Sequence, residues 1–302
     1  MLDVRRLRLL CDLARLGTIA AVAEAHMYTP SAVSQQLTTL EREAGVPLLE
    51  RTGRRVTLTP AGAVLVQHAQ TVLAALERAT AALAAAGTGL SGPLRIGAFP
   101  TAVRTLLPAA LVALGRAHPK LELMVSELDP AAVPDALRDR RLDVGLIHDY
   151  DVVPVRPDRA LDAVALLEET VFLAVPAADA GAGADPITDP VGDARDAAWI
   201  VGSPGTLCHT VALRVCRTAG FTPRVRHHAD DFATVLALVA AGQGASLVPQ
   251  LAAAQPPAGV RLIPLPTRRR TRIAYRQGAG THPAVAACVI AIRSSTKAYL
   301  DR

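Results

Sequence analysis

The sequence lacks any long uncharged apolar run. Apolar residues make up 51% of the 302 positions, yet no stretch of about eighteen or more of them is free of charge, so no membrane span is expected. The first seventeen residues alternate arginine and aspartate with leucine, without a continuous apolar segment or a small-residue cleavage site, and do not resemble a secretory signal. We therefore expect a cytoplasmic protein with no membrane partner.

Cysteine and lysine are both scarce. The four cysteines, Cys11, Cys208, Cys216 and Cys288, form no C-x-x-C pair, which argues against a zinc site, and a disulfide framework makes little sense in a reducing compartment. Only two lysines are present, so arginine carries nearly all the positive charge behind the net value of +5. That balance permits a polyanionic partner without requiring one.

Sequence motifs of catalysis are also missing. The chain has no G-x-S-x-G elbow, no H-E-x-x-H, no P-loop and no G-x-G-x-x-G after a predicted strand. We expect no catalytic residue, no cofactor and no metal. A small-molecule binding protein or an enzyme built on α/β lobes stays as the alternative from another class.

The first sixty residues instead predict short helices. Leucines at helical spacing predict a helix that ends at Gly17, and a second helix is predicted over 18–27. Thr29 suits the N-cap and Pro30 the first position of a third helix, which Gly45 ends. Two short helices across a tight turn predict a helix-turn-helix.

The third helix has an apolar face and a polar face that carries little charge. Val33, Leu37 and Leu40 form the inner stripe. Hydroxyls and carboxamides can pair with base edges in the major groove of DNA without full charges. The polar face therefore predicts DNA contacts, with a solvated face as the bland alternative; its members are Ser31, Ser34, Gln35, Thr38 and Arg42.

A basic turn follows the third helix. Arg51, Arg54 and Arg55 surround Gly53, and the alternating residues after them predict a short two-stranded wing. Arginines beside a recognition helix suit phosphate contacts, which position a protein on DNA without selecting a sequence. A solvated charge cluster is the alternative.

Thr59 and Pro60 repeat the helix-start signal and open a long helix to about residue 86. Its apolar residues are spaced 4, 3, 4, 3, 4, which is typical of a seam that packs against a partner helix. We expect this seam to form a homodimer, with packing against the chain's own next domain as the alternative. The seam residues are Leu65, Ala69, Val72, Leu76, Ala79 and Leu83.

From residue 91 the pattern changes to alternating strands and helices, including a single helix expected over 102–119. This pattern predicts a parallel α/β sheet. Two units joined by crossing strands resemble a hinged clamshell, with one lobe over about 91–162 plus 266–302 and the other over about 163–265.

Two glycine-containing turns, at 97–102 and 202–208, end strands in the two lobes and lead into helices. Ligands of open α/β sheets bind at such turns, so we expect a small polar or anionic effector between the lobes. Helix capping alone is the alternative. The predicted effector residues are Phe99, Pro100, Thr101, His148, Ser203, Thr206, Asp230, Val248 and Pro249.

Over essentially its full length the chain resembles the LysR-type transcriptional regulators. The residues that carry the resemblance are Ala20, Ala21 and Ala23, then "TPSAVSQQLTTLE" and "AGVPLLERTGRRVTLTPAG". Leu49 and Thr18 stand where the family usually has phenylalanine and serine, and both are conservative changes.

The resemblance implies a mixed α and α/β fold. Its parts would be a winged helix-turn-helix over 1–60, a linker and dimerisation helix with a hinge over 60–90, and a two-lobed, periplasmic-binding-protein-like effector domain over 91–302. It adds Thr29 and Pro30 to the base-contacting candidates. It also implies a homodimer or dimer of dimers on double-stranded DNA, with RNA polymerase as a candidate further partner. The expected function is sequence-specific, effector-modulated regulation of transcription.

Two features leave alternatives open. Cys208 and Cys216 suggest a thiol-based redox sensor, but eight residues along one predicted helix separate their Cα atoms by ~12 Å, whereas a disulfide needs less than about 7 Å. Buried structural cysteines are favoured. The basic cluster 268–272 suits DNA, a partner surface or a charged edge strand exposed to solvent, and the edge strand is favoured.

Overall fold

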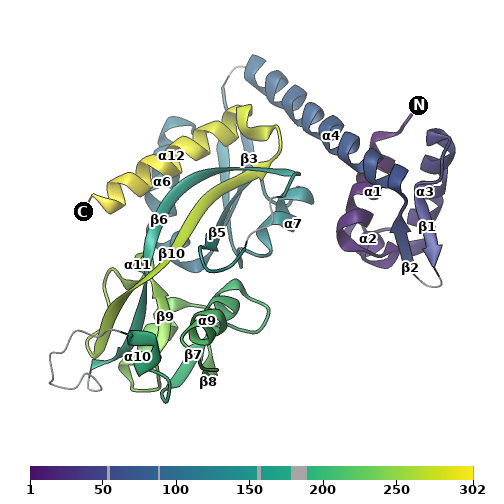
Figure 1. Cartoon of the computed structure of the whole chain (residues 1–302). Helices are drawn as coiled ribbons and strands as arrows, with labels where there is room; N and C mark the ends of the chain where they lie inside the picture. The colour runs from purple at the N-terminus through teal and green to yellow at the C-terminus, as the bar shows by residue number, and fades with distance from the viewer. Residues whose placement is uncertain (53–54, 88, 155–157, 178–188, 302) are drawn as a thin grey trace. The chain divides into compact units, whose positions relative to one another are not determined.

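The computed structural model describes residues 1–52, 55–87, 89–154, 158–177 and 189–301. They form two compact units (Figure 1). The N-terminal unit comprises Met1–Thr88 with Arg276–Pro283, and the C-terminal unit comprises Gly89–Tyr275 with Ala284–Arg302. Across the described ranges, no helix is long and apolar enough to cross a membrane.

Three short helices open the N-terminal unit at the positions that the sequence signals predict. They are α1 (Val4–Leu16), α2 (Ile19–Ala25) and α3 (Pro30–Ala44). The Thr29 hydroxyl accepts a hydrogen bond from the backbone N–H of Ala32, which satisfies a donor that the first turn leaves open. Gly17 and Gly45 end α1 and α3 with φ values of 74° and 72°, a conformation that favours glycine.

The wing follows α3 and is tied to the next helix. Strands β1 (Leu49–Thr52) and β2 (Arg55–Leu58) pair antiparallel, with Leu49 opposite Leu58. The Thr59 hydroxyl donates to the Pro47 carbonyl and accepts from the Gly62 N–H. A Cβ atom at Gly62 would lie 2.2 Å from the Leu48 carbonyl oxygen, so only glycine permits this close approach.

Helix α4 (Pro60–Ala86) has two different faces along its second half. Ala74 and Ala81 are buried on the side where the segment Arg276–Pro283, with its short helix η2 (Ala279–Thr281), packs. Arg276 Nε donates to Glu77 Oε2 at 3.3 Å on the same side. The predicted seam lies on the opposite side of α4 over its second half.

The C-terminal unit is built on a six-stranded sheet with the strand order β4-β3-β5-β10-β6-β9. Strands β3 and β4 and strands β3 and β5 pair parallel, whereas β5–β10 and β6–β9 pair antiparallel. The bounds are β3 (Gly92–Ala98), β4 (Leu121–Glu127), β5 (Val144–Tyr150), β6 (Leu161–Pro176), β9 (Ser246–Pro249) and β10 (Val260–Arg276). A second, parallel pair joins β7 (Ala198–Val201) to β8 (Arg224–His228).

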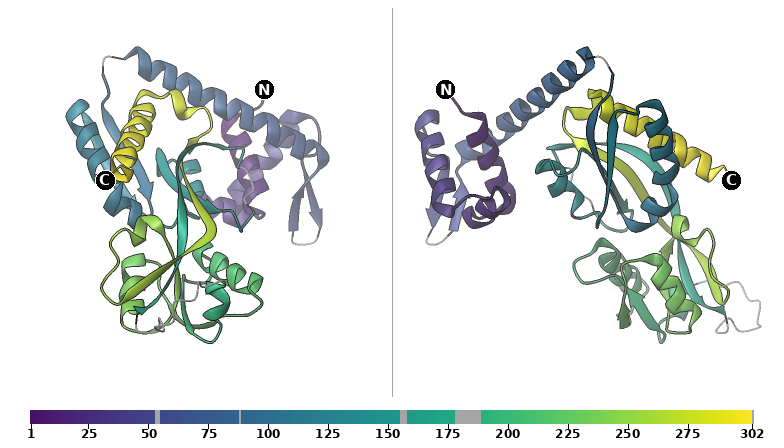
Figure 2. Two further views of the ribbon diagram at one scale, coloured as in Figure 1. Left: turned by 60° about the vertical axis from the view of Figure 1, so that its left-hand side comes forward. Right: turned by 180° about the vertical axis from the view of Figure 1, so that it is seen from behind.

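The long strands β6 and β10 run through both lobes of this unit (Figure 2), as the clamshell pattern predicts. The core of the first lobe joins β3 and β5 to helices from both ends of the unit, and the second lobe has separate cores around Trp199 and Val239. The helices are α5 (Pro100–Thr105), α6 (Leu107–Ala117), α7 (Val133–Arg138), α8 (Pro190–Asp193), α9 (Leu207–Thr218), α10 (Phe232–Ala240), α11 (Gln250–Ala253) and α12 (Pro283–Leu300).

Two sequence expectations are wrong in this unit. The single helix expected over 102–119 is two helices that meet at Leu106, because Pro108 has no N–H to donate to the preceding turn and its ring crowds that turn. The basic cluster 268–272 was expected on a charged edge strand, but β10 lies inside the sheet between β5 and β6.

Candidate DNA-binding surface and effector site

The polar face of α3 points away from the core of its unit. Val33, Leu37 and Leu40 are almost fully buried, as the apolar stripe predicts, and Ser34 is half-buried. The remaining predicted DNA contacts on this helix are exposed, namely Thr29, Pro30, Ser31, Gln35, Thr38 and Arg42. This exposed face presents hydroxyl, carboxamide and guanidinium groups, which can pair with base edges and phosphates.

Helix α1 holds α3 through a polar contact that sequence reasoning missed. Arg6 Nε donates to Gln36 Oε1 at 2.8 Å, and Arg6 also forms an ion pair with Glu43. The Asp3 N–H donates to the second Glu43 oxygen at 3.3 Å. These residues are separated by 30 to 40 positions, so no local pattern announces the contact. Arg6 and Glu43 therefore set the orientation of α3, and the Gln35 side chain stays exposed.

The wing is attached to the same helix. One oxygen of Glu41 accepts the backbone N–H groups of Leu48 and Leu49 at 2.9 and 3.0 Å. Arg51 and Arg55 lie on the paired strands β1 and β2, whereas Arg54, the third predicted phosphate contact, lies outside the described residues. The wing thus starts from a position that α3 fixes.

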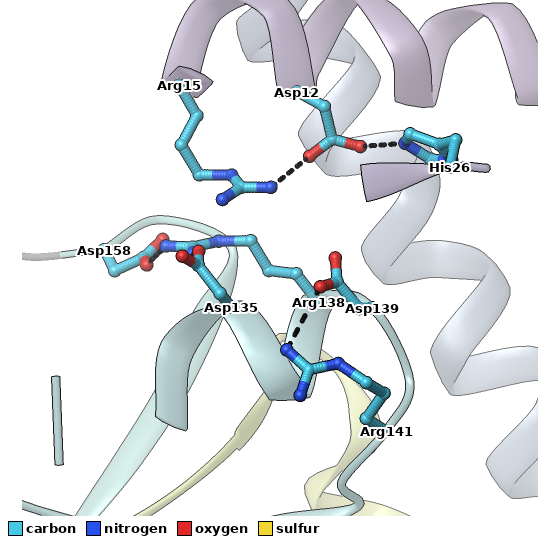
Figure 3. A network of polar contacts seen from close by, with 8 residues as sticks. All are labelled: Asp12, Arg15, His26, Asp135, Arg138, Asp139, Arg141 and Asp158. Atoms are coloured by element: carbon cyan, nitrogen blue, oxygen red, sulfur yellow. Dashed lines mark hydrogen bonds and ion pairs between the residues drawn. The ribbon is translucent and has the colours of Figure 1, made fainter. Parts of the chain in front are cut away.

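A further polar network braces the start of the helix-turn-helix (Figure 3). Asp12 on α1 accepts from Arg15 at 3.0 Å and pairs with His26, just after α2, at 2.8 Å.

Figure 3 also draws a separate network within the C-terminal unit. There Arg138 pairs with Asp135 and Asp158, and these ion pairs fasten α7.

The dimerisation seam predicted on α4 divides into two parts. Ala69 is fully buried in the core of its own unit and Leu65 is half-buried against it. Farther along, Val72, Leu76 and Leu83 are 41, 44 and 77% exposed, and Ala79 is exposed as well. The second half of the seam is therefore an uncovered apolar strip.

A cavity of about 40 Å³ opens beside the predicted turn of the second lobe. Thr206 and Asp230, both predicted effector residues, line it. Its other polar lining residues are Asp129, Cys208 and Ser246. Asp129 lies two residues after β4 ends, so the same strand-end rule that selected the two turns could have found it.

The turn beside this cavity is held rigidly. Both oxygens of Asp230 are occupied by Ser203, whose N–H and hydroxyl donate at 2.7 and 2.6 Å. The Gly202 carbonyl accepts Nδ1–H groups of His209 and His228 at 3.0 and 3.1 Å. Asp230 and Ser203 therefore hold the turn in place beside the cavity.

The predicted effector residues of the first lobe form a buried aromatic group. Phe99, Thr101 and His148 are buried, and the His148 ring stands edge-on to Phe99 at 5.1 Å and to Tyr150 at 5.5 Å. Burial, reinforced by the charge of Arg269, lowers the pKa of His148 well below its usual value, so the imidazole is neutral at pH 7.

Arg269 is the central residue of this group that sequence reasoning missed. Its guanidinium lies over the Phe99 ring at 5.1 Å, and its Nε and Nη2 contact Glu169 Oε1 at 2.7 and 2.6 Å. The arginine is fully buried. Strand alternation could have shown that Arg269 and Thr271 face opposite to Arg268, Arg270 and Arg272.

The last two predicted effector residues, Val248 and Pro249, are buried in the second lobe and pair with β6. Pro100 is half-buried at the start of α5. None of these three lines the cavity described above.

An ion pair connects the two lobes next to Asp230, which lines the cavity. Arg104 on α5 contacts Asp231, the N-cap of α10, at 2.7 Å. Burial alone would raise the pKa of Asp231, but the hydrogen bonds from Arg104 and from the Thr234 and Ala233 N–H groups outweigh it and hold that pKa below its usual value.

Cys208 and Cys216 lie two turns apart on α9, and both are free thiols. Burial raises the pKa of Cys216 to about 12 and also raises that of Cys208, although Arg269 and the Tyr150 hydroxyl partly oppose the rise at Cys208. The Tyr150 hydroxyl lies 3.8 Å from Cys208 Sγ. Within the described residues, no cluster of three or more metal-ligating side chains exists.

Comparisons with known proteins agree with this architecture. Residues 4–63 match the bacterial regulatory helix-turn-helix proteins of the lysR family, and residues 87–297 match the LysR substrate binding domain. The chain is 31% identical to a hydrogen peroxide-inducible genes activator of Dickeya chrysanthemi over 92% of its length and 90% of that protein. It is 30% identical to the DNA-binding transcriptional dual regulator OxyR of Escherichia coli K12, over 100% of this chain and 98% of that one.

Solved structures show the same fold. A cysteine mutant of Corynebacterium glutamicum OxyR has a TM-score of 0.59 at 24% identity, covering 100% of this chain and 93% of that one. Full-length CbnR complexed with its target DNA has a TM-score of 0.53 at 24% identity, with coverage of 97% and 100%. The family matches together span most of the chain, which therefore belongs to the LysR family of DNA-binding transcriptional regulators.

Proposed function

We propose that this regulator contacts the bases of its operator through the exposed face of α3 and responds to a small molecule bound between the lobes of its C-terminal unit. The observation that carries the DNA contact is the clean division of α3. Ser31, Gln35 and Thr38 are exposed, whereas Val33 and Leu37 are buried. A carboxamide such as that of Gln35 can pair bidentately with adenine.

Base contact is tested with operators selected from random duplex DNA by the wild-type chain. Gln35→Ala should weaken binding to the selected site by about 5- to 150-fold, which corresponds to about 1–3 kcal/mol for a bidentate base contact. Gln67→Ala, at an exposed glutamine of α4, is the matched control and should bind as wild type. Equal affinities for both variants would contradict base contact by Gln35.

The uncovered strip of α4 supports a homodimer. Val72, Leu76 and Leu83 are exposed apolar side chains at seam spacing, and helix α1 and the segment Arg276–Pro283 cover other sides of this helix. Leu76→Asp should convert the dimer to a monomer in sedimentation velocity. Val64→Asp, at an exposed valine of α4 outside the seam, should not. A Leu76→Asp dimer as stable as wild type would refute the assignment.

The effector assignment rests on the cavity beside Thr206 and on the rigid turn 202–206. A volume of about 40 Å³ suits a molecule of only a few heavy atoms, and the Arg104–Asp231 pair spans the lobes next to it. A thermal-shift screen of small metabolites should reveal a stabilising ligand, and Thr206→Val should weaken its binding. Thr210→Val, on the same helix, is the control. If neither variant loses ligand binding, the ligand-binding site lies elsewhere in the chain.

A thiol sensor is the second candidate, because Cys208 lines the cavity and the peroxide-inducible gene activators named above are relatives. The arrangement on α9 disfavours a bond between Cys208 and Cys216, since two helical turns separate them. After peroxide treatment, mass spectrometry should find no such disulfide in the folded chain. Its appearance, with a matching change in DNA binding, would make redox sensing the primary function.

A further inference from the structure

The pairing of β5 with β10 places four polar side chains on one face of the sheet. Thr271 lies opposite His148, and Arg269 lies opposite Tyr150. Residues two apart on a strand, and residues directly opposite each other in an antiparallel pair, point to the same side. His148, Tyr150, Arg269 and Thr271 therefore form one cluster where β10 passes between the lobes.

Three of these side chains are buried and carry polar atoms that lack a hydrogen-bond partner in the described part of the chain. Arg269 is 0%, Thr271 1% and His148 9% exposed. Among the described residues, nothing accepts from Arg269 Nη1, and neither the Thr271 hydroxyl nor either ring nitrogen of His148 has a partner. Buried polar groups in native proteins are almost always hydrogen-bonded, so a concentration of such atoms at one point calls for a ligand.

The neighbouring carboxylate cannot supply the missing acceptors. Glu169 uses Oε1 for Arg269 Nε and Nη2, and it uses Oε2 for the Leu251 N–H at 2.6 Å. Within the ranges that the structure describes, the two hydrogens on Arg269 Nη1 are unpaired donors. The Thr271 hydroxyl adds one donor, and the neutral imidazole of His148 adds one N–H. Donors therefore outnumber acceptors in the cluster.

We infer that this cluster binds the carboxylate group of a small ligand through Arg269, Thr271 and His148. A carboxylate presents acceptors only and suits the planar guanidinium, whereas water brings as many donors as acceptors. The rings of Phe99 and Tyr150, each packed against His148, give the cluster an apolar border beside its donors. This inference rests on the proposed effector-binding function and names its ligand class.

The location also connects the ligand to both lobes. Arg269 and Glu169 lie on the two long strands β10 and β6 that continue from one lobe to the other. Tyr150, which shares the face with Arg269, approaches Cys208 on α9 of the second lobe. A carboxylate on Arg269 therefore binds where the relative setting of the lobes is determined.

Acetate is the probe, titrated into the full chain at constant ionic strength with sodium chloride, and acetamide is the neutral control of the same shape. Acetate should raise the melting temperature and bind measurably by calorimetry, and acetamide should do neither. Thr271→Val keeps the side-chain shape and should weaken acetate binding by about 10- to 150-fold, the usual effect of removing a hydrogen bond to a charged group. Thr296→Val, at a buried threonine bonded to Ile292, should bind acetate as wild type.

Equal responses to acetate and acetamide, or unchanged acetate affinity in Thr271→Val, would overturn the inference. Binding of the selected operator by the same preparations is measured in parallel. A chain that binds DNA and responds to another ligand but not to acetate would refute only the carboxylate class. A chain that binds no DNA would refute the proposed function itself.

Discussion

Replacing Glu169 by glutamine leaves the side-chain size nearly unchanged but removes the negative charge that faces Arg269. Both side chains are almost fully buried, so the arginine would keep its charge without a counter-ion in a medium of low dielectric. Burial alone would lower the pKa of Arg269, and Glu169 is the main reason that this pKa is raised instead. We expect the free energy of unfolding of the C-terminal unit to fall by about 3–5 kcal/mol, the usual cost of breaking a buried pair.

Urea unfolding followed by the fluorescence of Trp199, which is buried in the same unit, measures this loss. Asp139→Asn removes a carboxylate from a pair in which Arg141 is 63% exposed, and it should cost less than about 1 kcal/mol. The double replacement Glu169→Leu with Arg269→Met should recover most of the stability, because apolar residues can replace a buried pair without an uncompensated charge. A Glu169→Gln variant as stable as Asp139→Asn would show that Arg269 finds its compensation elsewhere, and would refute the reasoning.

Three further predictions concern other parts of the chain. Asp231→Asn should destabilise the C-terminal unit at pH 7 and progressively less as the pH falls below about 4, because a carboxyl whose pKa is depressed when folded contributes above its unfolded value of about 4 and loses that contribution as the pH falls through its folded value; urea titrations across this pH range test this. Cys216, with a pKa near 12, should resist iodoacetamide at pH 8 in the folded chain and react only in urea, and rapid native labelling would contradict its burial. Arg6→Ala should weaken operator binding with an unchanged salt dependence, because Arg6 positions α3 through Glu43; a slope reduced by about one would identify it as a phosphate contact instead.

The helices of the N-terminal unit could be predicted because their signals are local. Thr29 caps the helix whose first residue is Pro30, and Gly45 ends it, so a window of seventeen residues contains the whole signal. The orientation of α3 could not be predicted in the same way. It depends on Arg6 and Glu43, which are 37 positions apart and meet only after α1 and α3 have packed.

The candidate effector site was predictable only in part, for the same reason. A strand end followed by a glycine-containing turn selected Thr206, and a helix start selected Asp230; both residues line the cavity. Arg269 and Glu169 are 100 positions apart, and their pairing requires β6 and β10 to be neighbours in the sheet. No property of either segment fixes that neighbourhood, since it follows from the order of all six strands.

The basic cluster 268–272 shows how one pattern can have two physical meanings. Taken as a block of charge, it suggests an exposed edge. Taken with the strand period of two, it divides into an inner set with Arg269 and an outer set with Arg270 and Arg272, both of which pair with Asp149. Because the two arginines share the single carboxylate of Asp149, the outer set keeps a net positive charge on this strand.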